Sequence, residues 1–262
     1  MTTEPNIGTQ VAIKFLRNYH EFGSRAHLVT ARLLTREIEA TLDPEERKLL
    51  AVKVFSEFMA SLEDLGAISI AIRHRDEGVG LVYSYLTYSL RSEKLSPPTT
   101  LPRIFELLAS GDGLVNGLRL PLLTEILKAL PAFEGTLIPT MYREANIALA
   151  QAAAVYLAQD KALVRAYNKT KHGFVVVSDQ HCFQPDPPKT ETESSWIVAK
   201  NPDYDPSHPA GIPVVELFAV RLKDVRNTLD RMPVIRGALM FITELTAVLL
   251  ELNLITSADT KA

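Results

Sequence analysis

Apolar side chains near the start of the chain recur at alternating spacings of four and three residues. The row consists of Phe15, Tyr19, Phe22, Ala26, Val29 and Leu33. A second row of smaller and more polar residues, which includes His20 and His27, lies one position further along the chain. This spacing is the period of a helix packed against other helices, and two adjacent rows predict an inner helix with two neighbours.

The next strong helix start is at Asp43 and Pro44. Aspartate suits the N-cap, proline suits the first helical position, and two glutamates follow in the first turn. The pattern predicts a helix from about 44 to the mid-60s or beyond. Its apolar side is predicted to carry Leu49, Leu50, Val54, Phe58 and Leu62.

Four more helical segments are predicted before residue 172. They are an amphipathic segment at 79–91, shorter helices at 101–110 and 119–130, and a long alanine-rich helix at roughly 136–171. The small side chains of the last helix permit close packing against a neighbour.

The pattern changes at Gly173. Compact β-branched stretches at 174–177 and 196–198 predict a β-hairpin with a long polar connection. Pro213 is predicted to open a final helical run to about residue 254, kinked or divided at Pro233.

These elements predict a mainly α fold, an antiparallel helical bundle with a small β-hairpin near residues 173–200. We expect one helical domain over 1–262, with 173–211 as an insert of hairpin and loop.

Composition narrows the class of protein. The chain is 47% hydrophobic and 23% charged with a net charge of −3, which is typical of a globular protein and argues against a generally basic coat for nucleic acid. One cysteine, Cys182, excludes an intramolecular disulfide. The first ten residues are polar, and the longest apolar stretches fall short of the roughly 20 residues that span a bilayer. We therefore expect a soluble, cytoplasmic protein without a membrane segment.

Arg165 and His172 are the candidate chemical residues. Seven positions is almost two helical turns, so the two side chains share a face, roughly 10 Å apart along the axis at 1.5 Å per residue. Guanidinium can hold a phosphate with two hydrogen bonds, and imidazole can move a proton near neutral pH. Their separation favours a site completed by a second protomer.

An arginine and a histidine separated by six residues, at the predicted end of a long helix, resemble the signature of the HEPN superfamily. Members of that superfamily are helical bundles, frequently dimers. Many are metal-independent endoribonucleases in toxin–antitoxin or phage-defence systems. The resemblance implies a homodimer, an RNA substrate, no metal or cofactor, and a protein partner such as an antitoxin.

The resemblance also implies roles for individual residues. Arg165 would clamp the phosphate and His172 would be the general acid or base, with the ribose 2′-OH as the nucleophile. Asn168, Lys169 and Lys171 would contact the substrate. The segment departs from the family at Ala166, where a polar residue commonly follows the arginine.

Other interpretations of the same region remain open. Lys169, Lys171 and His172 suit the negative end of a helix dipole and Gly173 suits the position after it, so the segment also fits an ordinary helix end. A second alternative is a metal site near the predicted hairpin, with ligands drawn from His172, His181, Cys182, Asp203, Asp205 and His208. A third is a helical protein without enzymatic activity that binds another protein or a ligand.

Overall fold

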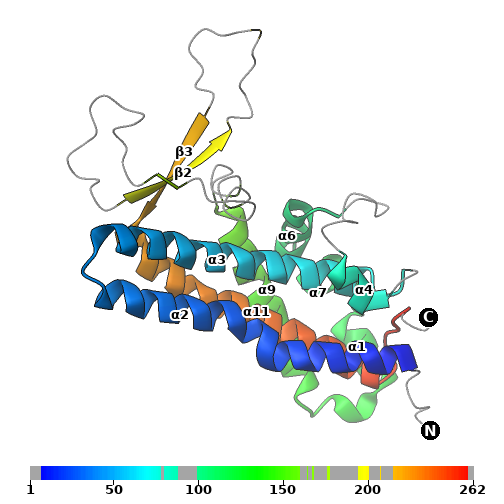
Figure 1. The fold of residues 1–262 in the computed structure, drawn as a ribbon. Helices are drawn as coiled ribbons and strands as arrows, with labels where there is room; N and C mark the ends of the chain where they lie inside the picture. Colours follow the sequence, from blue (N-terminus) through cyan, green and yellow to red (C-terminus); the bar gives the residue numbers. More distant parts are fainter. Residues whose placement is uncertain are drawn as a thin grey trace. The chain divides into compact units, whose positions relative to one another are not determined.

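The structure is a computed structural model. It describes residues 7–77, 80–87, 99–159, 176–177, 194–200 and 215–258, together with Val164, Tyr167 and Ser207. The described chain is mostly helical, as the sequence predicts (Figure 1). It divides into two compact units: the first comprises Met1–Ala26, Ser61–Ala158 and Pro233–Ala262, and the second comprises His27–Ala60 and Gln159–Met232.

Several elements belong to the first unit alone. They are α1 (Ile7–Asn18), the π-helix η1 (Tyr19–Gly23), α4 (Gly80–Leu86), α6 (Leu101–Ala109), α7 (Gly113–Asn116), α8 (Leu123–Ala129), the 3-10 turn η2 (Pro131–Phe133) and α9 (Ile138–Leu157). Three longer helices contribute residues to both units. These are α2 (Ser24–Ala40), α3 (Pro44–Arg73) and α11 (Val225–Glu251).

The second unit also contains the strands. These are β1 (Val176–Val177), β2 (Ser194–Lys200) and β3 (Val215–Arg221), followed by the 3-10 turn η4 (Leu222–Asp224). β2 pairs antiparallel with both of the others, and its register with β3 runs from Ser194 opposite Arg221 to Lys200 opposite Val215.

The predicted start of α3 is confirmed. Asp43 accepts hydrogen bonds from the backbone N–H of Glu45 at 2.9 Å and of Glu46 at 3.4 Å, and Pro44 is the first helical residue. This is the N-cap arrangement that satisfies amides without a partner inside the helix.

The predicted apolar side of α3 is largely correct. Val54, Phe58 and Leu62 are almost fully buried. Leu49 is the exception, because its side chain is 53% exposed.

An aromatic cluster lies in the first unit, with Tyr19 buried and Phe15 and Tyr85 half-buried. Phe15 and Tyr19 both lie against Tyr85, with ring centroids 5.2 Å and 5.7 Å from it. The Tyr19 hydroxyl donates to Asp64 at 2.7 Å. Burial raises the pKa of Tyr19, and the nearby Asp64 carboxylate raises it further. Gly23 permits this arrangement, since a Cβ there would meet the Tyr19 ring at 2.8 Å.

Within the first unit, α1 lies beside the C-terminal half of α11 (Figure 1). Arg17 pairs with Glu251 at 2.8 Å. One turn further along, the His20 Nδ1 atom lies 3.1 Å from the carbonyl oxygen of Met240. These two contacts join the end of α1 and the start of η1 to the C-terminal half of α11.

Two backbone segments pack closely at the start of α7. Asp112 caps α7 by accepting from the amides of Leu114 and Val115. A Cβ on Gly113 would lie 2.5 Å from the carbonyl oxygen of Leu108, so this close approach of two backbone segments requires glycine.

Two sequence predictions about element boundaries are wrong. The alanine-rich helix does not continue to residue 171, because α9 ends at Leu157 with Ala158 as its C-cap. Neither glycine nor proline marks this end, so the sequence offers no local signal for it. The helical run expected from Pro213 is also wrong at its start, because residues 215–221 form β3.

α11 begins at Val225 and continues through Pro233 as one helix, so of the two predicted outcomes at Pro233, a kink or a division, the division does not occur. Among the residues that the structure describes, one stretch, Leu222–Glu251, is long and apolar enough to cross a membrane, judged by length and composition alone. In its most apolar window, 56% of the residues are buried within the protein, as they would be in a core helix.

Candidate functional site

The site residues expected from the sequence lie outside the described residues. This applies to Arg165, Asn168, Lys169, Lys171 and His172 alike. α9 ends eight positions before Arg165, so the described part of that helix does not reach the motif.

The alternative metal ligands also lie outside the described residues. They are His172, His181, Cys182, Asp203, Asp205 and His208. Within the ranges that the structure covers, no group of three or more histidine, cysteine, aspartate or glutamate side chains is placed to hold a metal ion.

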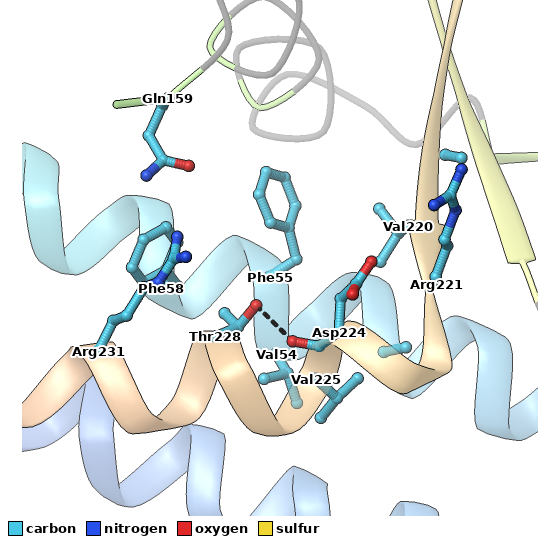
Figure 2. Close-up of a pocket in the computed structure, with 12 residues that line it drawn as sticks. Val54, Phe55, Phe58, Gln159, Val220, Arg221, Asp224, Val225, Thr228 and Arg231 are labelled. Carbon is cyan, nitrogen blue, oxygen red and sulfur yellow. Dashed lines mark hydrogen bonds between the residues drawn. The ribbon is translucent and has the colours of Figure 1, made fainter. Parts of the chain in front are cut away.

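The second unit contains a cavity of about 140 Å³. Its characteristic lining residues are Phe55, Phe58, Gln159, Arg221, Asp224 and Arg231, and we call it the aromatic pocket. Figure 2 shows the Phe55 ring rising from α3 into the pocket, with Phe58 and Arg231 on one side and Arg221 and Asp224 on the other.

The floor of the aromatic pocket follows from the spacing along α3. Phe55 and Phe58 are three positions apart, which places both rings on one face of the helix. Ala51 and Val54 extend the same apolar surface. Phe55 is 7% exposed and Phe58 is 2% exposed, so the floor is firmly packed.

The polar rim comes from the junction between β3 and α11. Arg221 is the last residue of β3, Asp224 ends the turn that follows, and Arg231 lies two turns into α11. The Thr228 hydroxyl donates to the backbone carbonyl of Asp224 at 2.9 Å, which ties the junction to the first turn of the helix (Figure 2).

Arg231 is the arginine of this rim that is exposed to solvent. Its side chain is exposed, and it makes no ion pair or hydrogen bond with the part of the chain that the structure describes. Asp224 is exposed too and brings one negative charge to the same rim. The rim thus carries two guanidinium groups, one carboxylate and the Gln159 amide above an apolar floor.

The size of the aromatic pocket limits what it can hold. Sites for drug-sized ligands are roughly 300–1,000 Å³, and this cavity is about 140 Å³. It can take one planar ring or one apolar side chain. The occupant is therefore best understood as a single residue of a larger molecule.

Comparison with known protein families, curated proteins and solved structures finds no match to this chain. The pocket must therefore be interpreted from its own chemistry.

Most of the residues that line the aromatic pocket were not predicted from the sequence. Phe58 was expected in the apolar side of α3, and Phe55 could have been added from the three-residue spacing alone. Arg221 and Asp224 could not, because their segment was expected to be helical and is instead a strand followed by a turn.

Proposed function

We propose that this chain is a HEPN-like RNA-binding protein. The observation that supports RNA binding is the aromatic pocket, with a buried phenylalanine floor beneath a rim that carries two guanidinium groups. Proteins that bind single-stranded RNA place unstacked bases against aromatic side chains and phosphates against arginine. A pocket sized for one ring suits one base of such a strand.

We also propose that the protein cleaves the RNA that it binds. Arg165 and His172 of two protomers form a composite site for metal-independent cleavage, with Asn168, Lys169 and Lys171 as substrate contacts. The support for this step is the sequence motif alone. The protein would be a cytoplasmic homodimer without a resident cofactor, regulated by a protein partner of the antitoxin kind.

The arrangement of the fold belongs to the same proposal. We propose that the helices assemble as an antiparallel bundle and that the segment near residues 173–200 is a β-hairpin insert. The contacts of α1 and η1 with α11 support the first part, and the antiparallel pairing of β1 with β2 supports the second.

A second candidate function is binding of a protein partner without enzymatic activity. The observation that favours it is Asp224, whose carboxylate on the rim of the pocket repels a phosphate. In this case the pocket would accept one apolar side chain of the partner, in the manner of an anchor residue at an interface.

RNA binding can be tested by fluorescence anisotropy with a labelled single-stranded RNA. We expect Arg231→Ala to weaken binding about tenfold and to reduce the salt dependence by about one released counterion. Arg226→Ala is the matched control, because Arg226 is an exposed arginine of the same helix that does not line the pocket. Wild-type protein that does not bind the RNA, or equal effects of the two variants, would refute this part of the proposal.

Cleavage needs a separate assay. We expect the wild-type protein to cut the RNA in the presence of EDTA, and Arg165→Ala and His172→Ala to abolish cutting. RNA binding should persist in His172→Ala, whereas Arg165→Ala should weaken it because the phosphate clamp is lost. His181→Ala is the control, because it removes a neighbouring histidine outside the motif. Intact RNA after prolonged incubation with the wild-type protein would refute the ribonuclease and leave the binding result to stand by itself.

A further inference from the structure

The first unit contains another cavity, of about 530 Å³. Residues of the turn that follows α7 and of the turn that ends α11 line it. Its characteristic residues are Arg75, Arg119, Leu120, Asn253, Leu254 and Ile255, and we call it the arginine groove. This volume lies within the roughly 300–1,000 Å³ of small-molecule sites.

Two turns with left-handed backbone line the arginine groove. Arg119 and Asn253 both have φ of 55°, in the left-handed region that residues other than glycine seldom adopt. In each turn the next amide bonds back to a carbonyl near the preceding helix end, at 3.0 Å for Leu120 and 2.9 Å for Leu254. At Asn253 these bonds are the usual left-handed ending of a helix, a position that asparagine adopts readily. At Arg119 the left-handed backbone is rarer, and strain of that kind is concentrated at ligand sites.

Arg75 is a buried cation that faces carbonyl groups. It is 6% exposed, and its guanidinium donates to the carbonyls of Ile72 at 2.9 Å, Leu118 at 3.0 Å and Arg119 at 2.8 Å. A guanidinium has five N–H groups. The Nε–H is buried without a partner in the described chain, and a second N–H, on Nη2, also remains.

The charge of Arg75 is not neutralised by contact with a carboxylate. No ion pair joins it to any described residue, and the acid that acts on its charge from a distance is the exposed Asp76. Burial lowers the pKa of Arg75, and the neighbouring guanidinium of Arg119 lowers it further. An anion that reaches this buried charge stabilises it, because burial of a charge without an oppositely charged partner is unfavourable.

The neighbouring charges leave the groove positive. Arg119 donates to Glu77 at 2.7 Å, and the other oxygen of Glu77 lies 2.7 Å from His74 Nδ1. Arg73 donates to carbonyls only, like Arg75. Three arginines therefore face two carboxylates, Glu77 and the exposed Asp76, and of the three only Arg119 is hydrogen-bonded to one.

We propose that the arginine groove binds a small organic anion with an apolar body, of the chemical class of a medium-chain carboxylate. The anionic head lies against Arg75 and Arg119, where the unused N–H groups form charge-assisted hydrogen bonds with it. The apolar body lies on Leu120, Leu254 and Ile255. This site is independent of RNA binding, since every residue in it belongs to the first unit.

Isothermal titration calorimetry with three probes tests the chemistry of the arginine groove. Octanoate has both the head and the body, octanol has the body without the charge, and inorganic phosphate has charge without the body. We expect octanoate to bind with one-to-one stoichiometry and at least about tenfold more tightly than either of the other probes. Equal binding of octanoate and octanol, equal binding of octanoate and phosphate, or no binding of octanoate would each overturn the proposal.

Two variants place the binding in the arginine groove. Arg119→Gln removes one cation, and Val115→Glu adds a negative charge to the groove wall while leaving every arginine in place. We expect each to weaken octanoate binding about tenfold, and Arg231→Gln in the aromatic pocket to have no effect. Should Arg119→Gln fail to fold, Val115→Glu decides the outcome. Unchanged octanoate affinity in the folded groove variants would overturn the assignment.

Discussion

The aromatic pocket of the second unit and the arginine groove of the first unit use positive charge in opposite ways. Arg231 is exposed and unpaired within the described chain, above a floor that contains Phe58 at 2% exposure. Arg75 is itself buried, and three backbone carbonyls hold it. In the aromatic pocket, the affinity for a ligand and the stability of the fold depend on different side chains, because Arg231 can be removed without loss of packing. In the arginine groove, both quantities depend on Arg75, since its guanidinium supports the fold and attracts the ligand.

The largest effect should come from the floor of the aromatic pocket. Phe58→Ala removes a buried ring and leaves a cavity, which lowers the free energy of unfolding by about 3–5 kcal/mol. Trp196 is the one tryptophan of the chain and lies in β2 of the same unit, so its fluorescence during urea unfolding measures the loss. Phe58→Leu is the control, with an expected loss of about 1.5 kcal/mol. A loss below about 1 kcal/mol for Phe58→Ala would show that the ring is not a structural floor.

The next effect should come from the buried guanidinium of the arginine groove. Arg75→Leu leaves the carbonyls of Ile72, Leu118 and Arg119 without their donors, and we expect a loss of about 3 kcal/mol in the free energy of unfolding. Thermal unfolding followed by circular dichroism should show a midpoint lowered by roughly 6–12 °C. Arg103→Leu is the control, because the side chain of this exposed arginine pairs with the exposed Glu106 and with no other described residue, and should contribute about 0.5 kcal/mol or less. Equal losses in the two variants would remove the contrast between buried and exposed arginine.

A smaller and pH-dependent effect is expected at Glu77. Its partial burial raises the pKa, but hydrogen bonds from His74 and Arg119 outweigh this and hold the pKa below its usual value. Glu77 therefore stabilises the protein above the unfolded-state pKa near 4.5, and this contribution is lost as the pH falls through the lower folded-state value.

Glu77→Gln tests this linkage. We expect it to lower the free energy of unfolding by less than about 1 kcal/mol at neutral pH, because the carboxylate is partly exposed. The difference from the wild-type protein should vanish in acid, and urea titrations across the acid range measure it. A difference that is the same at neutral and acidic pH would mean that the side chain acts through shape and not through charge.

The smallest effect on stability should come from Arg231. Arg231→Ala should change the free energy of unfolding by less than about 0.5 kcal/mol, while its effect on RNA affinity is the one predicted above. Trp196 fluorescence during urea unfolding measures the first quantity. If this variant unfolded as easily as Arg75→Leu, Arg231 would be part of the packing, and the comparison between the two sites would fail.

Local signals in the sequence predicted local structure well. Asp43 and Pro44 identified the start of α3 because an N-cap depends only on the next few residues. The helix predicted at 101–110 is α6, Leu101–Ala109. The end of α9 was missed because no glycine or proline marks Ala158.

Non-local pairing explains the remaining failures at the candidate site. The segment Val215–Arg221 is short and apolar, and such segments suit a helix or a strand equally well by periodicity. The segment forms a strand because it pairs with β2, and this partner lies earlier in the chain, outside the window that a local pattern covers. Arg221 and Asp224 reach the aromatic pocket through this junction, so their place in it could not be predicted. The phenylalanines could, because both lie on one helix.

The π-helical turn at Tyr19–Gly23 has a consequence for how the length of this chain can vary. Its closing bond runs from the Ser24 amide to the Tyr19 carbonyl, five residues back, where an α-helix would reach back four. The turn is thus equivalent to an α-helical turn with one inserted residue. Removal of the exposed Phe22 would convert it into ordinary α-helix at little cost in packing. A single-residue deletion should be tolerated here better than elsewhere in α1 or α2, where every deletion rotates the remaining side chains by about 100°.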